Sequence, residues 1–381
     1  MEFELVRPFV HAAREEGRPS TDSRDHDSIR SGRESIRSGS PAASSHAHDQ
    51  MNGFSPTRGP LSPVKTSGSQ SQASLDAYRA REQKWMTLIS TTSHKSKKVR
   101  KLVLEGVPAS VRSRVWAYLT DSKSRQTPGV FAQLSSKGSP QLAERIEGDV
   151  QRLFAGEAHL TEPKGRGPVL NILQAYFVMV PDVPYQPDVA IVAGNLALQC
   201  PEEEAFWTLV QLMESHLRGY FSAMPVQLDV DATLFAKAVD HADSALSIRL
   251  FADMHVPPVD LCQSWFLSLF ARTLPSEIQH RVWDIFLFEG PTFLFRVGLA
   301  LLHVVRRQIF SMQGMAVPQI IAFLARPPPQ AFHPDPEAFV QLCFTMKLKE
   351  DELRKARIKN AEQQLKERQL GRFASRPGAR R

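Results

Sequence analysis

The chain has 381 residues, of which 42% are hydrophobic and 23% are charged. These values are ordinary for a globular protein, and the length allows one large domain with tails or two small domains. The formal net charge is +7, but the basic stretches at 95–101 and in the C-terminal tail are not interleaved with aromatic residues, so we expect no nucleic-acid partner.

The three cysteines, Cys200, Cys262 and Cys343, lie far apart and form no CxxC pair. A sparse, odd count is typical of a reducing compartment, so we expect small buried apolar side chains and no disulfide framework. The N-terminus carries acids, which excludes a secretory signal, and charged residues and a proline interrupt the most apolar stretch, 285–305. We therefore expect a cytoplasmic protein with no transmembrane segment.

Composition divides the chain into three parts. Residues 17–74 are rich in Ser, Gly, Pro and Arg, and such a segment buries too little apolar surface to offset the entropy lost on ordering. We predict a mostly disordered N-terminal region at 1–77, a folded domain at 78–346 and a charged tail at 347–381. The tail has thinly spaced apolar residues among Lys, Arg, Glu and Gln, which favours an exposed helix.

The folded part has helical apolar spacing throughout. Apolar residues recur three and four positions apart, and prolines or acids open several segments. The expected helices are 79–89, 108–119, 142–154, 169–180, 189–198, 202–217, 234–242, 262–271, 277–287, 292–310 and 318–324. Because alternating apolar and polar runs of any length are missing, we predict an all-α fold.

Six segments follow one another in a family order. They are Arg81–Trp85; Gly106–Pro108 with Arg112 and Val115–Trp116; Ile146 with Asp149 and Arg152; Ala175–Tyr176 with Pro181 and Tyr185; Glu203–Trp207; and Trp265–Phe266, Leu269–Phe270, Leu274–Pro275, Arg281–Asp284 and Glu289–Gly290. Each fragment alone is unspecific. Together, across most of 78–346, they resemble the TBC domain family, the Rab GTPase-activating proteins.

The resemblance implies a multi-helix TBC domain that binds a Rab-type small GTPase in its GTP-bound state and accelerates GTP hydrolysis. It implies that Arg152 is an arginine finger, because a guanidinium supplied in trans stabilises the charge on the phosphoryl oxygens in the transition state. By the same resemblance, Asp149 and Tyr185 support the finger and Ile146 packs beneath it.

The same residues have plainer interpretations when they are taken alone. Asp149 and Arg152 are three positions apart on a helix and would form a solvated ion pair. The five tryptophans lie in apolar helical runs, which favours core or subunit-contact anchors. The resemblance nevertheless implies that Arg112 and Trp116 are partner-binding residues.

The chain departs from the family pattern at a second finger. TBC domains supply a glutamine that orients the attacking water, in the order tyrosine, any residue, glutamine, glycine, methionine. Here the segment reads Tyr185-Gln186-Pro187-Asp188-Val189, so the glutamine comes one residue early and an acid replaces the glycine. Either a local backbone shift at the proline lets Gln186 reach the water, or this finger is lost, because a shift of one residue rotates a side chain by about 100° around a helix axis.

Motifs for other chemistries are missing from the sequence. There is no phosphate-binding P-loop, no ligand spacing for zinc and no nucleophile elbow. We expect neither a metal nor a cofactor, and no catalysis beyond stimulation of a partner GTPase.

Three functional hypotheses remain. The favoured one is a Rab GTPase-activating protein in vesicle-mediated intracellular protein transport, cytoplasmic or peripheral on endomembranes. The second is a non-catalytic GTPase-binding adaptor on a TBC fold with degenerate fingers, which would bind without acceleration. The third is an unrelated helical scaffold whose motifs are packing coincidences.

Overall fold

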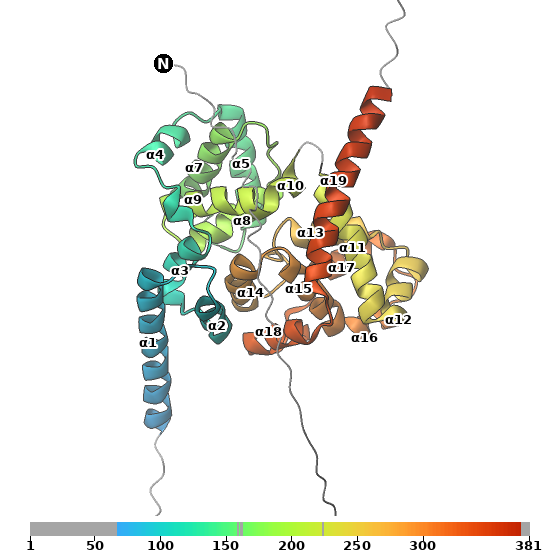
Figure 1. Ribbon diagram of the computed structural model, residues 1–381, viewed down its shortest axis with the longest axis horizontal. Coiled ribbons are helices and arrows are strands. Elements are labelled where there is room, and N and C mark those ends of the chain that lie inside the picture. The colour runs from blue at the N-terminus through green and yellow to red at the C-terminus, as the bar shows by residue number, and fades with distance from the viewer. Residues whose placement is uncertain (1–66, 158–159, 161–162, 223–224, 375–381) are drawn as a thin grey trace, which may run out of the picture. The chain divides into compact units, whose positions relative to one another are not determined.

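The computed structural model describes residues 67–157, 160, 163–222 and 225–374. Regular structure in these ranges is helical and includes no strand (Figure 1), which confirms the expected all-α class. Most of the N-terminal region that we expect to be disordered lies outside the described residues. Among the described helices, none is long and apolar enough to cross a membrane.

The first group of helices runs from α1 to α10. Its members are α1 (Ser67–Thr91), α2 (Lys97–Glu105), α3 (Arg112–Leu119), α4 (Val130–Ser135), α5 (Pro140–Leu153), α7 (Pro163–Met179), α8 (Pro187–Gln199), α9 (Glu202–Leu212) and α10 (Arg218–Phe221). Short 3₁₀ turns lie at Ala109–Val111 and Ser122–Ser124, and a π-helical turn lies at Met213–Leu217.

The second group runs from α11 to α19. Its members are α11 (Val226–Ala242), α12 (Ser244–Ser247), α13 (Pro258–Phe266), α14 (Ser276–Glu289), α15 (Thr292–Val304), α16 (Arg306–Ser311), α17 (Val317–Ala325), α18 (Pro336–Thr345) and α19 (Glu350–Ala374). A π-helical segment, Ile248–Asp253, follows α12, and a 3₁₀ turn lies at Pro329–Ala331.

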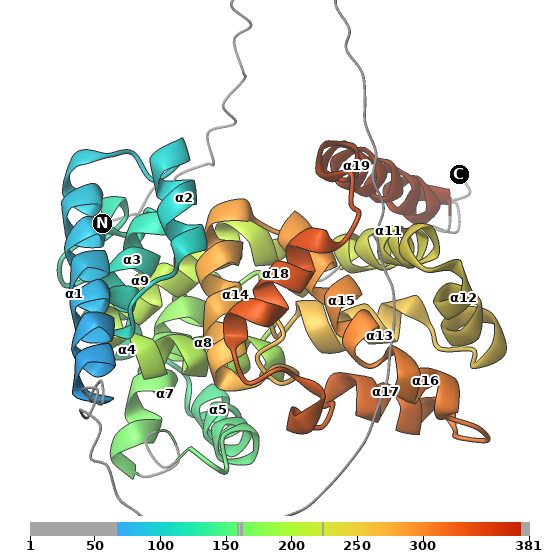
Figure 2. The ribbon, with the colours of Figure 1, turned by 90° about the horizontal axis from the view of Figure 1, so that it is seen from below.

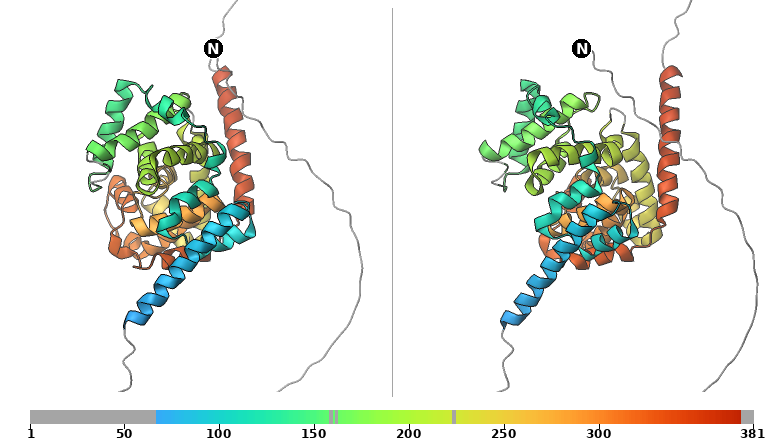
Figure 3. Two further views of the ribbon diagram at one scale, coloured as in Figure 1. Left: turned by 90° about the vertical axis from the view of Figure 1, so that its left-hand side faces the viewer. Right: turned by 60° about the vertical axis from the view of Figure 1, so that its left-hand side comes forward.

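Helix α14 joins the two groups. In the first group, α7 packs against α4, α5, α8 and α9, and in the second group α11 packs against α13, α15 and α19. Helix α14 contacts α2 and α3 as well as α15 and α18, and it lies between the groups in Figure 2. The two 25-residue helices, α1 and α19, lie on the outside of the helix groups (Figure 3).

Local sequence signals explain where the helices near the candidate site begin. The Ser139 side chain accepts a hydrogen bond from the backbone N–H of Leu142, and Pro140 is the first residue of α5. Pro187 is likewise the first residue of α8, although this helix has no side-chain cap. A proline at the first helical position loses no intrahelical hydrogen bond. These two starts set the positions of Asp149, Arg152 and Asp188 on their helices.

The buried core includes the aromatic residues expected to anchor it. Trp85, Trp116, Trp265 and Trp283 are fully buried and Trp207 is 5% exposed, which confirms their role as core anchors. Three of the indole N–H groups donate to backbone carbonyls of other elements, so each fixes one element against another. All three cysteines are free and buried, as expected.

Several expected helices have different bounds in the structure. The expected helix 79–89 lies within α1 (Ser67–Thr91), which begins inside the region expected to be disordered, and 234–242 is the end of α11 (Val226–Ala242). The expected helix 262–271 begins at Pro258 and ends at Phe266, because Leu269 and Phe270 take positive φ angles that cannot continue a right-handed helix. The expected helix 292–310 breaks at Val305, whose φ of −93° and ψ of 10° leave the helical region. The last five residues of 202–217 wind as a π-helix.

Candidate functional site

Asp149 connects two of the residues predicted for the site. Its Oδ1 accepts a 2.6 Å hydrogen bond from Nη2 of Arg152, and its Oδ2 accepts a 2.9 Å hydrogen bond from the Tyr185 hydroxyl. The Asp149 side chain is 18% exposed and that of Arg152 is 62% exposed. The predicted ion pair on α5 is confirmed. The Arg152 guanidinium is exposed to solvent, and it is paired with the Asp149 carboxylate, which Tyr185 also contacts.

Tyr185 is itself held by its neighbours. The guanidinium carbon of Arg145 lies 5.3 Å from the centroid of the Tyr185 ring, within the range of a cation–π contact. Burial raises the pKa of the Tyr185 hydroxyl, and its hydrogen bond to Asp149 raises it further, so the hydroxyl remains a donor. Ile146 is fully buried on the same helix and supports it from the core.

A polar cleft of about 620 Å³ opens beside Arg152. Its walls come from residues 152–157, from α8, from the turn before α14, from the first turns of α14 and from the residue after α17. The polar side chains that line it are Arg152, Glu157, Asn195, Gln199, Arg272, Ser276, Gln279, His280 and Arg326. The cleft therefore brings together residues from both helix groups.

Two further arginines make this cleft cationic. Within the described part of the chain, neither Arg272 nor Arg326 has a salt-bridge partner. The amide nitrogen of Gln279, a side chain only 2% exposed, has no hydrogen-bond partner either. Because an unpaired buried donor costs free energy, these groups suit an acceptor oxygen that enters the cleft.

A strained turn between α13 and α14 presents Arg272 to the cleft. Leu269 and Phe270 have φ angles of 50° and 60°, in the left-handed region that bulky residues rarely adopt. The indole N–H of Trp283 donates a 2.9 Å hydrogen bond to the Leu269 carbonyl, and the Phe270 N–H donates one of 2.8 Å to the Trp265 carbonyl. Hydrogen bonds to two buried tryptophans therefore hold the backbone turn that precedes Arg272.

Asp188 faces a second cavity, of about 650 Å³, that shares Arg272 and Arg326 with the cleft. Burial raises the pKa of Asp188, whereas Arg272 and, more weakly, Arg152 act to lower it. No salt bridge joins Asp188 to a described cation. Its carboxylate therefore lies in the field of both arginines without direct contact.

Gln186 is not fixed to this cluster. It is the N-cap residue of α8, with an extended backbone at φ −133° and ψ 146°, and Pro187 and Asp188 follow in the first turn. Its side chain has no hydrogen-bond partner among the described residues and lines neither cavity. The structure thus joins Arg152, Asp149 and Tyr185, and it leaves Gln186 without a contact to them.

The expectation that Trp116 and Arg112 bind a partner disagrees with their burial. Trp116 is fully buried, and its indole N–H donates a 2.8 Å hydrogen bond to Asp284. Arg112, whose side chain is 12% exposed, pairs with the same carboxylate at 3.3 Å. These contacts join α3 to α14. Trp116 has no accessible surface with which to contact a partner, and most of Arg112 is covered.

His280 lines the cleft as a neutral side chain. Burial lowers its pKa to about 4, and the charge of Arg112 contributes in the same direction. No three His, Cys, Asp or Glu side chains in the described ranges gather closely enough to hold a metal ion.

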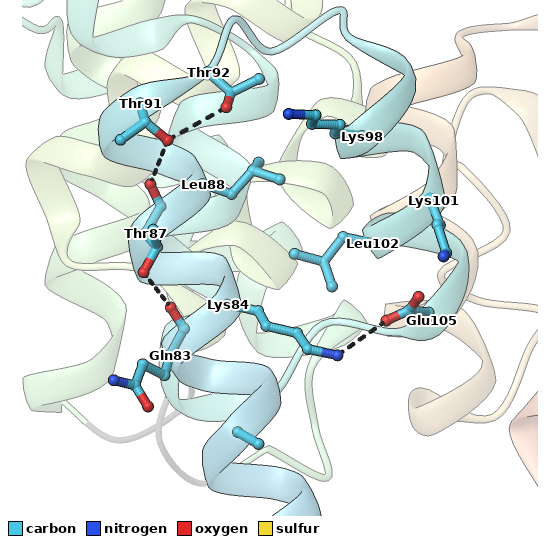
Figure 4. A pocket seen from close by; sticks show the side chains of 11 residues that line it. Gln83, Lys84, Thr87, Leu88, Thr91, Thr92, Lys98, Lys101, Leu102 and Glu105 are labelled. Carbon is cyan, nitrogen blue, oxygen red and sulfur yellow. Dashed lines mark hydrogen bonds and ion pairs between the residues drawn. The ribbon is translucent and has the colours of Figure 1, made fainter.

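A separate groove, of about 570 Å³, lies between α1 and α2, away from these two cavities (Figure 4). Leu88 and Leu102 point into it, and Lys98 and Lys101 line it from α2. None of the residues predicted for the site lines this groove. We therefore place the candidate functional site at the cleft of Arg152.

Sequence reasoning missed several residues in and around that cleft. Arg145, which contacts Tyr185, could have been found, because it lies four and seven positions before Asp149 and Arg152 on one helix face. Arg272 and Arg326 are more than a hundred residues away from Arg152 in the chain, and no local pattern marks either of them. Only the packing of α8, α13, α14 and α17 brings them beside it.

Comparisons with known proteins agree with this fold. The family model of the Rab-GTPase-TBC domain matches residues 109–310. Human TBC1 domain family member 10B is 36% identical over 262 residues, which cover 65% of this chain and 32% of that protein. Mouse carabin is 34% identical over 242 residues, which cover 61% of this chain and 54% of that protein. The matched part is thus about a third of the length of the human relative.

Solved structures match over most of the described chain. The Chlamydomonas flagellar RabGAP TBC domain has a TM-score of 0.59 at 25% identity, covering 75% of this chain and 97% of that chain. The Ypt/Rab-GAP domain of Gyp1p has a TM-score of 0.58 at 18% identity, covering 70% and 98%, and shows the likeness of fold alone. Because the family model spans more than half of this sequence, the chain belongs to the Rab-GTPase-TBC domain family.

Proposed function

We propose that this chain is a GTPase-activating protein for a Rab-type small GTPase and that Arg152 is its arginine finger. The observation that carries the proposal is the exposed guanidinium of Arg152, held by Asp149 at the rim of a cationic cleft. A guanidinium supplied in trans accelerates GTP hydrolysis by roughly a thousandfold or more, which corresponds to about 4 kcal/mol off the barrier.

Arg152 is free to change partners when a GTPase docks. Its ion pair with Asp149 is formed by an exposed side chain, and such pairs contribute little free energy. A phosphate oxygen in a site that excludes water is a stronger acceptor for the planar guanidinium than an exposed carboxylate is. Arg152 would therefore exchange Asp149 for the nucleotide. Tyr185 would keep Asp149 in place, so that the ion pair with Arg152 forms again after the GTPase dissociates.

We further propose that Gln186 does not orient the attacking water. Pro187 stands where the family pattern has glutamine, and no contact fixes Gln186 relative to Arg152. A group that is misplaced by about 1 Å loses most of its effect in such a reaction. The glutamine of the GTPase itself would then orient the water, while this chain supplies positive charge.

Residues 78–346 form the functional domain in this proposal. Its place of action would be the cytoplasm or the surface of endomembranes, in vesicle traffic, because Rab-type GTPases in their GTP-bound state are the partner. The family membership and the likeness to a flagellar RabGAP domain support this assignment.

The departure at Pro187 and Asp188 favours one alternative, a GTPase-binding adaptor without activity. A panel of GTP-loaded Rab proteins separates the two functions when phosphate release and binding are measured on the same samples. The proposal predicts faster phosphate release on at least one Rab, and the same acceleration with Gln186→Ala. GTP-dependent binding with no acceleration on any Rab would support the adaptor, and a large loss in Gln186→Ala would return the glutamine to the mechanism.

A further inference from the structure

Two carboxylates lie in the field of the Arg152 guanidinium, and of these only Asp149 contacts it. Asp149 holds it directly, with a hydrogen bond of 2.6 Å. Asp188 is near enough for the charge of Arg152 to act on it, although no salt bridge joins them. Asp188 also stands where the family pattern has glycine, so this second negative charge is a feature of the present sequence. A carboxylate at this place opposes the approach of a triphosphate and draws Arg152 away from it.

Arg272 is the described cation that acts most strongly on Asp188. Both residues line the cavity of about 650 Å³, and Arg272 also lines the cleft of Arg152. Arg272 lowers the pKa of Asp188 more than Arg152 does. Without the charge of Arg272, Asp188 would be balanced by Arg326, which lines the same cavity, and by Arg152.

The backbone that carries Arg272 is held in a costly conformation. Two consecutive bulky residues, Leu269 and Phe270, have positive φ angles, and hydrogen bonds involving Trp265 and Trp283 maintain them. Such a conformation costs free energy at each residue and persists only where the surroundings enforce it. The strained turn therefore fixes the backbone from which the exposed Arg272 side chain lines both cavities.

We propose that Arg272 is a positioning residue for the stimulated reaction: it offsets the charge of Asp188 and so leaves Arg152 free to reach the nucleotide. Arg326 adds positive charge to the same two cavities, but it is not among the groups with the largest effect on Asp188. The inference rests on the proposed GTPase-activating function and assigns that function a second arginine.

The first test uses the protein alone. Aspartate labelled with ¹³C at the carboxyl carbon reports the titration of Asp188 by NMR, with the signal assigned by its loss in Asp188→Asn. Arg272→Gln should raise the pKa of Asp188, because its strongest cationic neighbour is gone. Arg307→Gln removes an exposed arginine on α16 that lines neither cavity, and it should leave the titration unchanged. An unchanged titration in Arg272→Gln overturns the electrostatic link.

The second test measures phosphate release from the GTP-loaded Rab that the wild-type protein accelerates. Arg272→Gln should lower kcat/KM by about fivefold, the order expected for one partly solvated charge, and Arg272→Lys should retain most of the activity. Asp188→Asn should raise kcat/KM about twofold. Adding Asp188→Asn to Arg272→Gln should restore activity to the level of Asp188→Asn alone.

The double substitution separates an electrostatic role from a structural one. If Arg272 only supported the turn, the double variant would remain as slow as Arg272→Gln, and Arg272→Lys would fail as well. Acceleration by the wild type that Arg272→Gln leaves unchanged overturns the role of Arg272 alone. A wild-type protein that accelerates no Rab in the panel overturns the proposed function itself.

Discussion

Tyr185 donates a hydrogen bond of 2.9 Å to the Asp149 oxygen that Arg152 does not use. The carboxylate is thus oriented from one side and offers its other oxygen to the guanidinium. Without the tyrosine, Asp149 could rotate and the resting position of Arg152 would no longer be defined. The interaction joins the residues before α8 to the end of α5. It requires a hydroxyl at position 185, which tyrosine supplies and phenylalanine would not.

Tyr185→Phe should therefore reduce the stimulated rate by about three- to tenfold, which corresponds to about 0.7–1.4 kcal/mol, the net contribution of a typical hydrogen bond. Stability should change little, because the ring and its contacts with Arg145 and Phe177 remain. Single-turnover phosphate release measures the rate. Tyr118→Phe is the matched control, because it removes a hydroxyl that donates to the Thr92 carbonyl outside the cleft. Equal rates for both variants would remove Tyr185 from the account.

Asp284→Ala should lower the free energy of unfolding by about 3–5 kcal/mol, because it leaves buried positive charge without its partner. The fully buried carboxylate accepts from Trp116 and pairs with Arg112 at 3.3 Å. Urea unfolding followed by circular dichroism measures the loss. Asp253→Ala, which breaks an exposed 3.8 Å pair, should stay within about 0.5 kcal/mol of wild type. A similarly small loss at Asp284 would contradict the lock between α3 and α14.

His280 should make stability depend on pH in the acid range. Its pKa is lowered to about 4 in the folded protein, by burial first and by Arg112 second, from an ordinary value of 6.5. The unfolded chain then binds the proton more readily than the folded one, so stability falls as the pH drops from 6.5 towards 4. The loss should reach about 2 kcal/mol when partial solvent screening is allowed for. His280→Gln should remove this part of the slope in urea titrations at pH 7 and pH 4.5, and an unaltered slope would show that the histidine is not buried as described.

Gly194→Ala should disturb the end of α5. A Cβ atom at Gly194 would overlap the ring of Phe154, the C-cap residue two positions after Arg152. Overpacking of this kind costs about 1–3 kcal/mol, and the displaced helix end should slow the stimulated reaction as well. Gly148→Ala makes the same substitution on α5, where a Cβ atom meets nothing within 4 Å, and it should stabilise the helix by about 0.5–1 kcal/mol. Thermal unfolding of both variants provides the comparison, and equal shifts would contradict the packing argument.

Much of the fold follows from local pattern, whereas the charge environment of the cleft does not. Helical spacing predicted a helix at 142–154, close to the observed Pro140–Leu153, and the spacing of Asp149 and Arg152 predicted their ion pair. The helices α4 and α18 are among those that were not expected. Helix α4 is only six residues long, and the apolar residues of α18 show little helical periodicity.

The cluster around Arg152 illustrates the limit of sequence reasoning. Its cations Arg272 and Arg326 come from a strained turn and from the end of α17, and their juxtaposition depends on tertiary packing. The reverse error concerns Trp116, for which a family motif suggested a binding role and burial indicates a core role. Motif matching cannot separate these roles, because both require the same residue at the same place.

The most direct test of the central claim is single-turnover phosphate release with Arg152→Ala, on a Rab protein that the wild-type chain accelerates. Arg307→Ala is the control for removal of an exposed arginine elsewhere, and binding to the GTP-loaded Rab confirms that the variant still docks. We predict a loss of about a thousandfold in the stimulated rate with Arg152→Ala, little recovery with Arg152→Lys, and no loss with Arg307→Ala. Full acceleration by Arg152→Ala would contradict the assignment of Arg152 as the arginine finger.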